Sequence, residues 1–160
     1  MIKVIRLTLM LIMFISLISF AEAREIENLP TFKTPQQLSN WLMCNFKYHK
    51  EIGDHWQSPE ETLQKRSGDC EDFAILVIVM LKKMGIKSDM VILTFRGLSM
   101  GHVICIWKDC DGIVNFISNR ELVYTRKTSI EEAVKRFYPD CNGIIYNDNR
   151  LKRANRRYNK

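Results

Sequence analysis

The chain has 160 residues and a formal net charge of +6, and its length is typical of one domain with a real hydrophobic core. The sequence shows no internal repeat and no linker that would divide it further. Its five cysteines are an odd number, so they cannot all pair within the chain, and their spacing excludes the Cys-x-x-Cys motif of structural zinc sites.

The first 23 residues are predicted to be a signal peptide. Lys3 and Arg6 form a basic start, residues 7–20 form an apolar run, and Ala21-Glu22-Ala23 is a small-x-small cleavage motif. The competing interpretation is a membrane anchor, but the apolar run is short for a span of about 20 residues. We therefore expect cleavage after Ala23 and a periplasmic or secreted protein.

The remaining pattern predicts an α+β domain over residues 24–149. Helical spacing and capping motifs predict helices at residues 34–46, 58–67, 70–84 and 129–137. Runs of β-branched and aromatic residues predict strands at 90–95, 101–107, 113–118 and 144–146. The helices come mainly first, and the turn at residues 109–112 makes a hairpin of two strands, so the sheet is expected to be antiparallel.

One motif joins a glycine turn to an apolar helix, in the run Ser67-Gly68-Asp69-Cys70-Glu71-Asp72-Phe73-Ala74. Asp69 is predicted to be the N-cap, which places Cys70 at the start of the helix. There the helix dipole and the free backbone amides favour a thiolate, so Cys70 is a candidate nucleophile. The alternative is a small buried hydrophobic residue, the commonest role of a free cysteine.

A second candidate, His102, follows Gly101 at the start of a predicted strand. A thiol nucleophile needs an imidazole within hydrogen-bond reach to take its proton, and a strand end can approach the N-terminus of a helix packed on the sheet. A structural histidine at a strand edge is the alternative. His49 and His55 lie in a polar segment and are expected to be solvated.

The other four cysteines are predicted to have structural roles or none. Cys105 lies within an apolar strand and is expected in the core. Cys110 and Cys141 lie beside turn residues and are the best candidates for a disulfide bond in an exported protein.

Three segments together resemble the bacterial transglutaminase-like cysteine proteinases: residues 56–62 (WQSPEET), residues 68–74 (GDCEDFA) and Gly101-His102-Val103. The resemblance extends over roughly residues 56–122. It implies an exported enzyme with a papain-like core and a Cys-His-Asp triad, in which Cys70 is the nucleophile and His102 the base.

The third member of the triad is where the sequence departs from this family. The family's aspartate stands at the end of the strand after the histidine strand, and here Ser118 and Asn119 occupy that place. Ser118 has the family's alignment, whereas Asn119 has an amide oxygen that can orient an imidazole. Only one of them can face His102 unless the strand ends between them, because consecutive strand residues point to opposite faces. Neither supplies a negative charge.

The resemblance also raises the question of a metal ion. In some members of the family, acidic residues beside the cysteine bind calcium, which implies Asp69, Glu71 and Asp72 as ligands here. The competing interpretation is that these residues only cap the helix and complement its dipole. No cofactor is otherwise expected.

The function that we expect is that of an exported thiol hydrolase, which cleaves peptide or protein amide bonds through an acyl-thioester on Cys70. The Cys70 backbone N–H is the expected oxyanion donor, with Gln57 as a second. One alternative is transfer of the acyl group to an amine, as in transglutaminases. The other is a binding module of the same fold with a decayed triad.

Residues 150–160 form a basic tail, which is expected to be flexible and solvated. The functional alternative is attraction to an anionic surface. The expected partner is a protein or peptide substrate, and nucleic acid is not expected for an exported protein.

Overall fold

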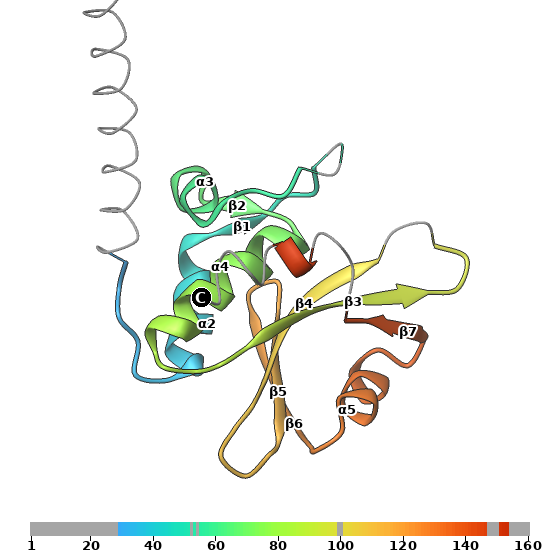
Figure 1. The fold of residues 1–160 in the computed structure, drawn as a ribbon. Coiled ribbons are helices and arrows are strands. Elements are labelled where there is room, and N and C mark those ends of the chain that lie inside the picture. The colour runs from blue at the N-terminus through green and yellow to red at the C-terminus, as the bar shows by residue number, and fades with distance from the viewer. Residues whose placement is uncertain (1–28, 52, 54, 99–100, 147–150, 154–160) are drawn as a thin grey trace, which may run out of the picture. The chain divides into compact units, whose positions relative to one another are not determined.

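We describe the fold from a computed structural model, which consists of two compact units, Met1–Pro30 and Thr31–Lys160. The second unit contains every helix and strand discussed below (Figure 1). The described residues are 29–51, 53, 55–98, 101–146 and 151–153. The predicted signal peptide, residues 1–23, lies outside them. Within these ranges, no helix combines the length and the apolar content needed to cross a membrane.

The second unit has an α+β fold, as the sequence predicts. Its helices are α2 (Pro35–Asn45), α3 (Pro59–Lys65), α4 (Cys70–Lys83) and α5 (Ile130–Phe137). Its strands are β1 (Lys47–Tyr48), β2 (Ser67–Gly68), β3 (Asp89–Phe95), β4 (His102–Lys108), β5 (Val114–Ser118), β6 (Glu121–Lys127) and β7 (Cys141–Ile145).

Five of the strands form one antiparallel sheet in the order β6-β5-β4-β3-β7. The hairpin of β4 and β5 is confirmed, with Ile104 opposite Ser118 and Lys108 opposite Val114. Strand β6 was not predicted, and β7 begins at Cys141, earlier than expected. A separate parallel pair joins β1 to β2 and pairs Tyr48 with Gly68, just before α4.

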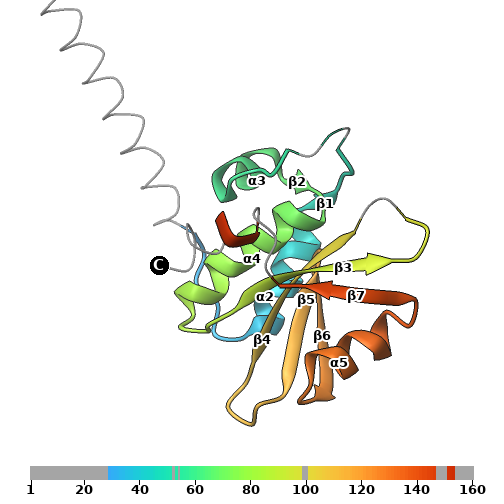
Figure 2. The same ribbon diagram turned by 45° about the vertical axis from the view of Figure 1, so that its right-hand side comes forward.

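Helix α4 is the buried centre of the fold, as its apolar sequence predicts. Every residue from Asp72 to Leu81 is buried. Strand residues alternate between the two faces of a sheet. Ile104 and Ile106 of β4 join a core cluster with Val134 of α5. Val103 and Cys105 therefore point to the opposite face, where α4 packs against β4 (Figure 2).

The predicted helix starts are found in the structure. Thr34 caps α2, and its hydroxyl accepts from the Gln37 N–H at 3.3 Å. Ser58 and Glu61 form the predicted capping box of α3, because Ser58 Oγ accepts from the Glu61 N–H and the Glu61 carboxylate accepts from the Ser58 N–H at 2.8 Å. These caps fix the entry into α3, which leads directly to the turn before α4.

The predicted disulfide bond is wrong, because all five cysteines are free thiols. Cys110 lies in the exposed turn between β4 and β5, whereas Cys141 is buried opposite Phe95, at the far end of β3. The antiparallel register therefore puts the two cysteines at opposite ends of the sheet. Cys105 is fully buried in β4, as predicted.

The predicted basic tail is described only at residues 151–153, which are helical. Leu151 is fully buried, so this residue belongs to the packed part of the chain. The prediction of a flexible, solvated end for the rest of the tail concerns residues outside the described ranges.

Candidate active site

Cys70 is the first residue of α4, and Asp69 stands at the predicted N-cap position. The glycine before them is required by close packing. A Cβ atom on Gly68 would lie 2.7 Å from Asp72 Cβ, closer than non-bonded carbon atoms approach. The Gly-Asp-Cys sequence thus lets the chain pass tightly over the first turn of the helix and present the thiol at the helix start.

The surroundings of the Cys70 thiol differ from the sequence prediction. Its Sγ donates a hydrogen bond to Glu71 Oε2 at 3.1 Å. Burial raises the pKa of Cys70, the Glu71 hydrogen bond and the charges of Glu71 and Asp69 add to the rise, and the Val103 N–H opposes it. The net result is a pKa of about 12. The predicted thiolate is therefore wrong for this state, because burial and two acidic neighbours outweigh the helix dipole.

The Val103 N–H links the thiol to the start of β4, where His102 precedes Val103. His102 is half-buried, and burial lowers its pKa, so the imidazole is neutral at neutral pH. Gly101 brings this strand close to β3, because a Cβ atom there would lie 2.8 Å from the Leu93 carbonyl oxygen. The structure thus brings Cys70 and the His102 strand together, as the sequence predicts.

Ser118, and not Asn119, contacts the imidazole. Ser118 Oγ lies 2.8 Å from His102 Nε2. Ser118 stands opposite Ile104, so it shares one face of the sheet with Ile104 and His102. Because this contact occupies Nε2, Nδ1 is the imidazole nitrogen that would have to meet a thiol.

Asn119 serves the turn between β5 and β6 instead. Its φ is 52°, in the left-handed region that asparagine tolerates better than most residues. Its side-chain oxygen is buried and has no hydrogen-bond partner among the described residues. Sequence chemistry favoured Asn119 as the orienting group, but the turn takes it away from His102.

A third side chain, Tyr138, extends this arrangement and was missed by sequence reasoning. Its hydroxyl donates to Ser118 Oγ at 2.7 Å, and its ring centroid lies 5.7 Å from that of His102. Tyr138 follows α5 directly, 20 residues after Ser118. No motif marks it, since only the packing of α5 on the sheet brings it to the site.

Acidic side chains surround the start of α4. Asp69, Cys70 and Glu71 offer atoms that all lie within 4.8 Å of one another. Burial raises the pKa of Asp69 and the neighbouring Glu71 raises it further, as expected of carboxylates without a nearby cation. One Asp69 oxygen is buried with no hydrogen-bond partner among the described residues. Carboxylate oxygens are the ligands that a hard cation such as Ca²⁺ prefers, and Asp69 and Glu71 could supply part of the roughly six to eight oxygens that it takes.

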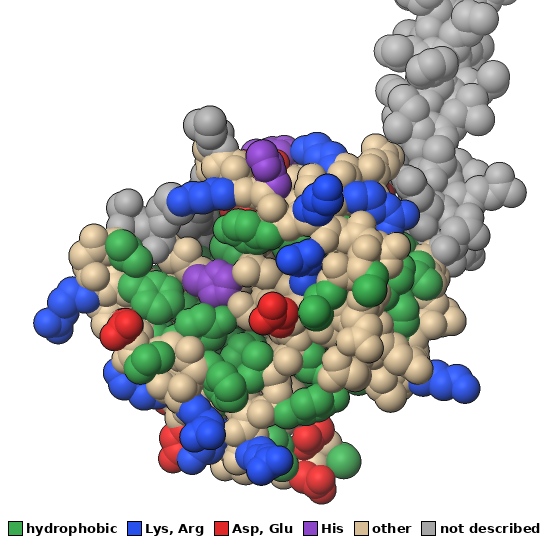
Figure 3. Space-filling view, turned by 180° about the vertical axis from the view of Figure 1, so that it is seen from behind, with side chains coloured by type: hydrophobic (Ala, Val, Ile, Leu, Met, Phe, Trp, Pro, Cys, Tyr) green, Lys and Arg blue, Asp and Glu red, His purple; other side chains and the backbone are tan. Residues whose placement is uncertain are grey.

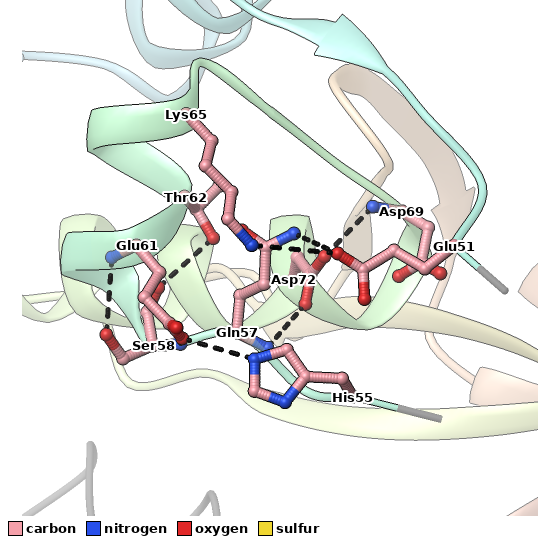
Figure 4. A network of polar contacts seen from close by, with 9 residues as sticks. All are labelled: Glu51, His55, Gln57, Ser58, Glu61, Thr62, Lys65, Asp69 and Asp72. Atoms are coloured by element: carbon pink, nitrogen blue, oxygen red, sulfur yellow. Dashed lines mark hydrogen bonds and ion pairs between the residues drawn. The ribbon is translucent and has the colours of Figure 1, made fainter. Parts of the chain in front are cut away.

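Asp72, the third predicted calcium ligand, differs from Asp69 and Glu71 because both of its oxygens accept backbone hydrogen bonds. It is fully buried, and its two oxygens accept from the Gln57 N–H at 2.8 Å and from the Asp69 N–H at 3.1 Å (Figure 4). Burial raises its pKa to about 6. Asp72 therefore ties the turn before α3 to the start of α4.

Gln57, the predicted second oxyanion donor, lies in the same network. Its side chain is buried, and its amide nitrogen donates to Glu51 Oε1 at 2.8 Å (Figure 4). Glu51 also pairs with Lys65, whose Nζ lies 3.8 Å from the carboxylate. The oxyanion roles of Gln57 and of the Cys70 N–H stay predictions.

His49 and His55 are exposed, as predicted.

A surface depression of about 790 Å³ borders the site through Tyr138. Its lining combines apolar residues with both signs of charge: Phe95, Arg96, Leu98, Lys135, Phe137 and Asp140. On the face seen in Figure 3, hydrophobic side chains gather in the middle and Lys and Arg side chains lie around them. Tyr138 thus stands between the imidazole and an open part of the surface.

Two bacterial proteins are among the solved structures that align with this chain. Calcium-bound LapG from Legionella pneumophila aligns with a TM-score of 0.54 over 82% of this chain and 84% of its own, at 17% identity. A candidate cysteine protease from Cytophaga hutchinsonii aligns with a TM-score of 0.47 over 62% of this chain and 35% of its own, at 19% identity. At such identities, the LapG alignment establishes the fold.

Sequence comparisons point the same way. A curated relative from Archaeoglobus fulgidus, a UPF0252 protein, is 40% identical over 53 residues, which are 33% of this chain and only 17% of the relative. The model of the transglutaminase-like superfamily matches residues 21–110, more than half of the chain, including Cys70 and His102. The chain therefore belongs to the transglutaminase-like superfamily.

Proposed function

We propose that this protein is an exported thiol hydrolase that cleaves peptide or protein amide bonds through an acyl-thioester on Cys70. One observation carries the proposal: the Cys70 thiol, at the first position of α4, meets the backbone N–H of Val103, next to His102. The family and the fold support a cysteine-based site. Residues 1–23 support export to the periplasm or beyond.

The raised pKa of Cys70 and the lowered pKa of His102 favour a neutral thiol beside a neutral imidazole. The proton therefore moves from Sγ to His102 as the sulfur attacks the carbonyl carbon, and not before. The imidazolium then protonates the departing amine. The Cys70 N–H, at the positive end of α4, is the proposed donor to the oxyanion, with Gln57 as a second donor.

Calcium fits this proposal as an activator. Asp69 and Glu71 would hold the ion, and Asp72 supports them from behind through the Asp69 N–H. When bound, the cation supplies positive charge beside the two carboxylates whose charges raise the pKa of Cys70. A bound calcium ion in LapG is consistent with such a site on this fold.

The test is substrate capture. Purified wild-type and Cys70→Ala proteins are incubated, with calcium, with a surface and periplasmic protein extract that also contains a biotinylated primary amine. We expect new peptide N-termini with the wild type, none with Cys70→Ala, and a substrate that co-purifies with the variant. Biotin incorporated into the products would support acyl transfer to an amine instead of hydrolysis. Equal products from both proteins would refute a Cys70 mechanism.

A binding module with a decayed triad is the second candidate. It is favoured by Ser118, which gives His102 no negative partner, and by the raised pKa of Cys70. In that case Cys70→Ala would leave protein capture unchanged, and neither protein would produce new N-termini.

A further inference from the structure

We propose that Tyr138 is a positioning residue that acts on His102 through the Ser118 hydroxyl and takes over part of the role of the missing carboxylate. The inference rests on the proposed function only in that His102 is the base of the reaction. Three groups form a continuous chain, from His102 Nε2 to Ser118 Oγ at 2.8 Å and from Ser118 Oγ to the Tyr138 hydroxyl at 2.7 Å.

The tyrosine ring is firmly held, so its hydroxyl has a defined place. The ring packs against Phe95 and Phe116, at centroid distances of 6.3 and 6.0 Å. The Tyr138 N–H also closes α5 by donating to the Val134 carbonyl oxygen at 2.7 Å. The phenol is thus anchored by the helix end and by the core on the His102 face of the sheet.

A serine alone would be a poor orienting group. Its hydroxyl can turn among three staggered positions, and it gives an imidazole no charge. The tyrosine hydroxyl selects one of these positions, the one in which Oγ meets Nε2. This holds Nε2 against Ser118, so that Nδ1 is the nitrogen left to take the proton of the thiol in the proposed reaction.

The hydroxyl pair also differs from a carboxylate in its chemistry. Each hydroxyl can either donate or accept. For Nδ1 to take the thiol proton, the neutral imidazole must carry its hydrogen on Nε2, so Ser118 Oγ accepts from Nε2–H both before and after the transfer. The Ser118 proton then turns to the tyrosine oxygen. Hydrogen bonds from a charged group are about twice as strong as neutral ones, so the pair favours the imidazolium more than the neutral ring.

The titratable groups near His102 do not mask the effect of the two hydroxyls on its pKa. Burial is the cause of the lowered pKa of His102. Burial raises the pKa of Tyr138, the Ser118 hydrogen bond lowers it, and the charges of Glu121 on β6 and Cys70 on α4 raise it. The Tyr138 phenol is therefore neutral at neutral pH and acts through its hydroxyl dipole.

The test measures the pKa of His102 by ¹⁵N-histidine NMR on the full chain without substrate. We expect Tyr138→Phe to lower this pKa by about 0.3 to 1 pH unit, because the Ser118 proton loses its acceptor. His49 and His55, which are exposed and take no part in this hydrogen-bond chain, serve as internal references. The matched control is Tyr124→Phe, which removes the hydroxyl of an exposed tyrosine on β6.

Ser118 variants complete the test. Ser118→Ala is expected to lower the pKa of His102 as well, and adding Tyr138→Phe to it should change nothing more, since the tyrosine acts through the serine. Ser118→Asp is expected to raise the pKa of His102. A His102 pKa that is the same in Tyr138→Phe as in wild type, or a full Tyr138→Phe effect in the Ser118→Ala background, would overturn the proposal.

These outcomes are independent of whether the enzyme turns over a substrate. If the His102 pKa responds as expected but no hydrolysis is found, the positioning role of Tyr138 stands and the proposed function fails. If hydrolysis is found and the pKa does not respond, the proposed function stands and the role of Tyr138 fails.

Discussion

At the scale of single residues, the site depends on which physical effect dominates at Cys70. A cysteine at a helix start is expected to ionise easily, because the helix dipole favours the thiolate. Here burial and the carboxylates of Glu71 and Asp69 act in the opposite direction and raise the pKa to about 12. The sequence shows those carboxylates, but only the structure shows that the thiol is buried and donates to Glu71.

This balance predicts how Cys70 responds to pH. In calcium-free buffer, the rate at which iodoacetamide alkylates Cys70 should not level off near neutral pH and should still increase above pH 9. The reason is that the thiol is still largely protonated at these pH values. Glu71→Gln removes the acceptor charge and lowers the pKa of Cys70, so alkylation at pH 8 should rise about three- to tenfold.

Peptide mapping by mass spectrometry follows Cys70 separately from the exposed Cys44 and Cys110. The control is Glu132→Gln, an exposed glutamate on α5, which should leave the Cys70 rate unchanged. If the alkylation rate of Cys70 in the wild type reached its plateau by pH 7, the thiolate would already be stable at that pH. The acidic neighbours would then not control the ionisation of Cys70.

At the scale of elements, the short turn between β2 and α4 sets the geometry of the site. Gly68 pairs with Tyr48 in the β1–β2 ladder, and Asp72 reaches back to the Asp69 N–H. Burial raises the pKa of Tyr48, and the charges of Cys70, Asp69 and Glu71 raise it further, so β1 also borders the site. The pair β1–β2 and Asp72 thus hold the start of α4 from two sides.

Gly68→Ala tests this turn. The added Cβ atom would lie 2.8 Å from Asp72 Oδ2, so the carboxylate or the turn must move. We expect a loss of about 1–3 kcal/mol in the free energy of unfolding, measured by urea denaturation. Ser67→Ala, one residue earlier, adds no atom and should cost much less. Equal stabilities of Gly68→Ala and wild type would mean that the turn tolerates a side chain.

At the scale of the whole molecule, the sequence predicts most of the elements because their signals are local. The apolar run of α4, the caps at Thr34 and Ser58, and the turn between β4 and β5 each determine their own element. Strand β6 was missed because only two residues, Asn119 and Arg120, separate it from β5. Tyr138 was missed because its role depends on how α5 packs.

Strand register explains both the choice between Ser118 and Asn119, which the sequence left open, and the disulfide candidate, which was wrong. The choice between Ser118 and Asn119 depends on where the strand ends, and the left-handed backbone of Asn119 ends it one residue before the better orienting group. The Cys110–Cys141 pair was inferred from turn residues, but sheet register separates them. Both are properties of strand register, which single positions in a sequence do not show.

Calcium binding should be visible in the stability of the whole domain. If Asp69 and Glu71 hold the ion, chelation should lower the melting temperature by roughly 5–10 °C from its value with calcium at a hundredfold excess over Kd. Glu71→Gln should abolish this response, whereas Glu132→Gln should keep it. A wild-type melting temperature that is the same with calcium and with chelator would assign the acidic residues to helix capping alone.

The most direct test of the central claim is site-resolved labelling with a peptidyl vinyl sulfone, which needs both a bound peptide and an assisted thiol. Cys44 and Cys110 are more exposed than Cys70, so unassisted chemistry would label them first. We predict that the calcium-loaded protein is labelled at Cys70 in preference to both, and that His102→Ala removes the Cys70 label while leaving the others unchanged. Labelling that follows exposure, or that survives in His102→Ala, would contradict a Cys70–His102 active site.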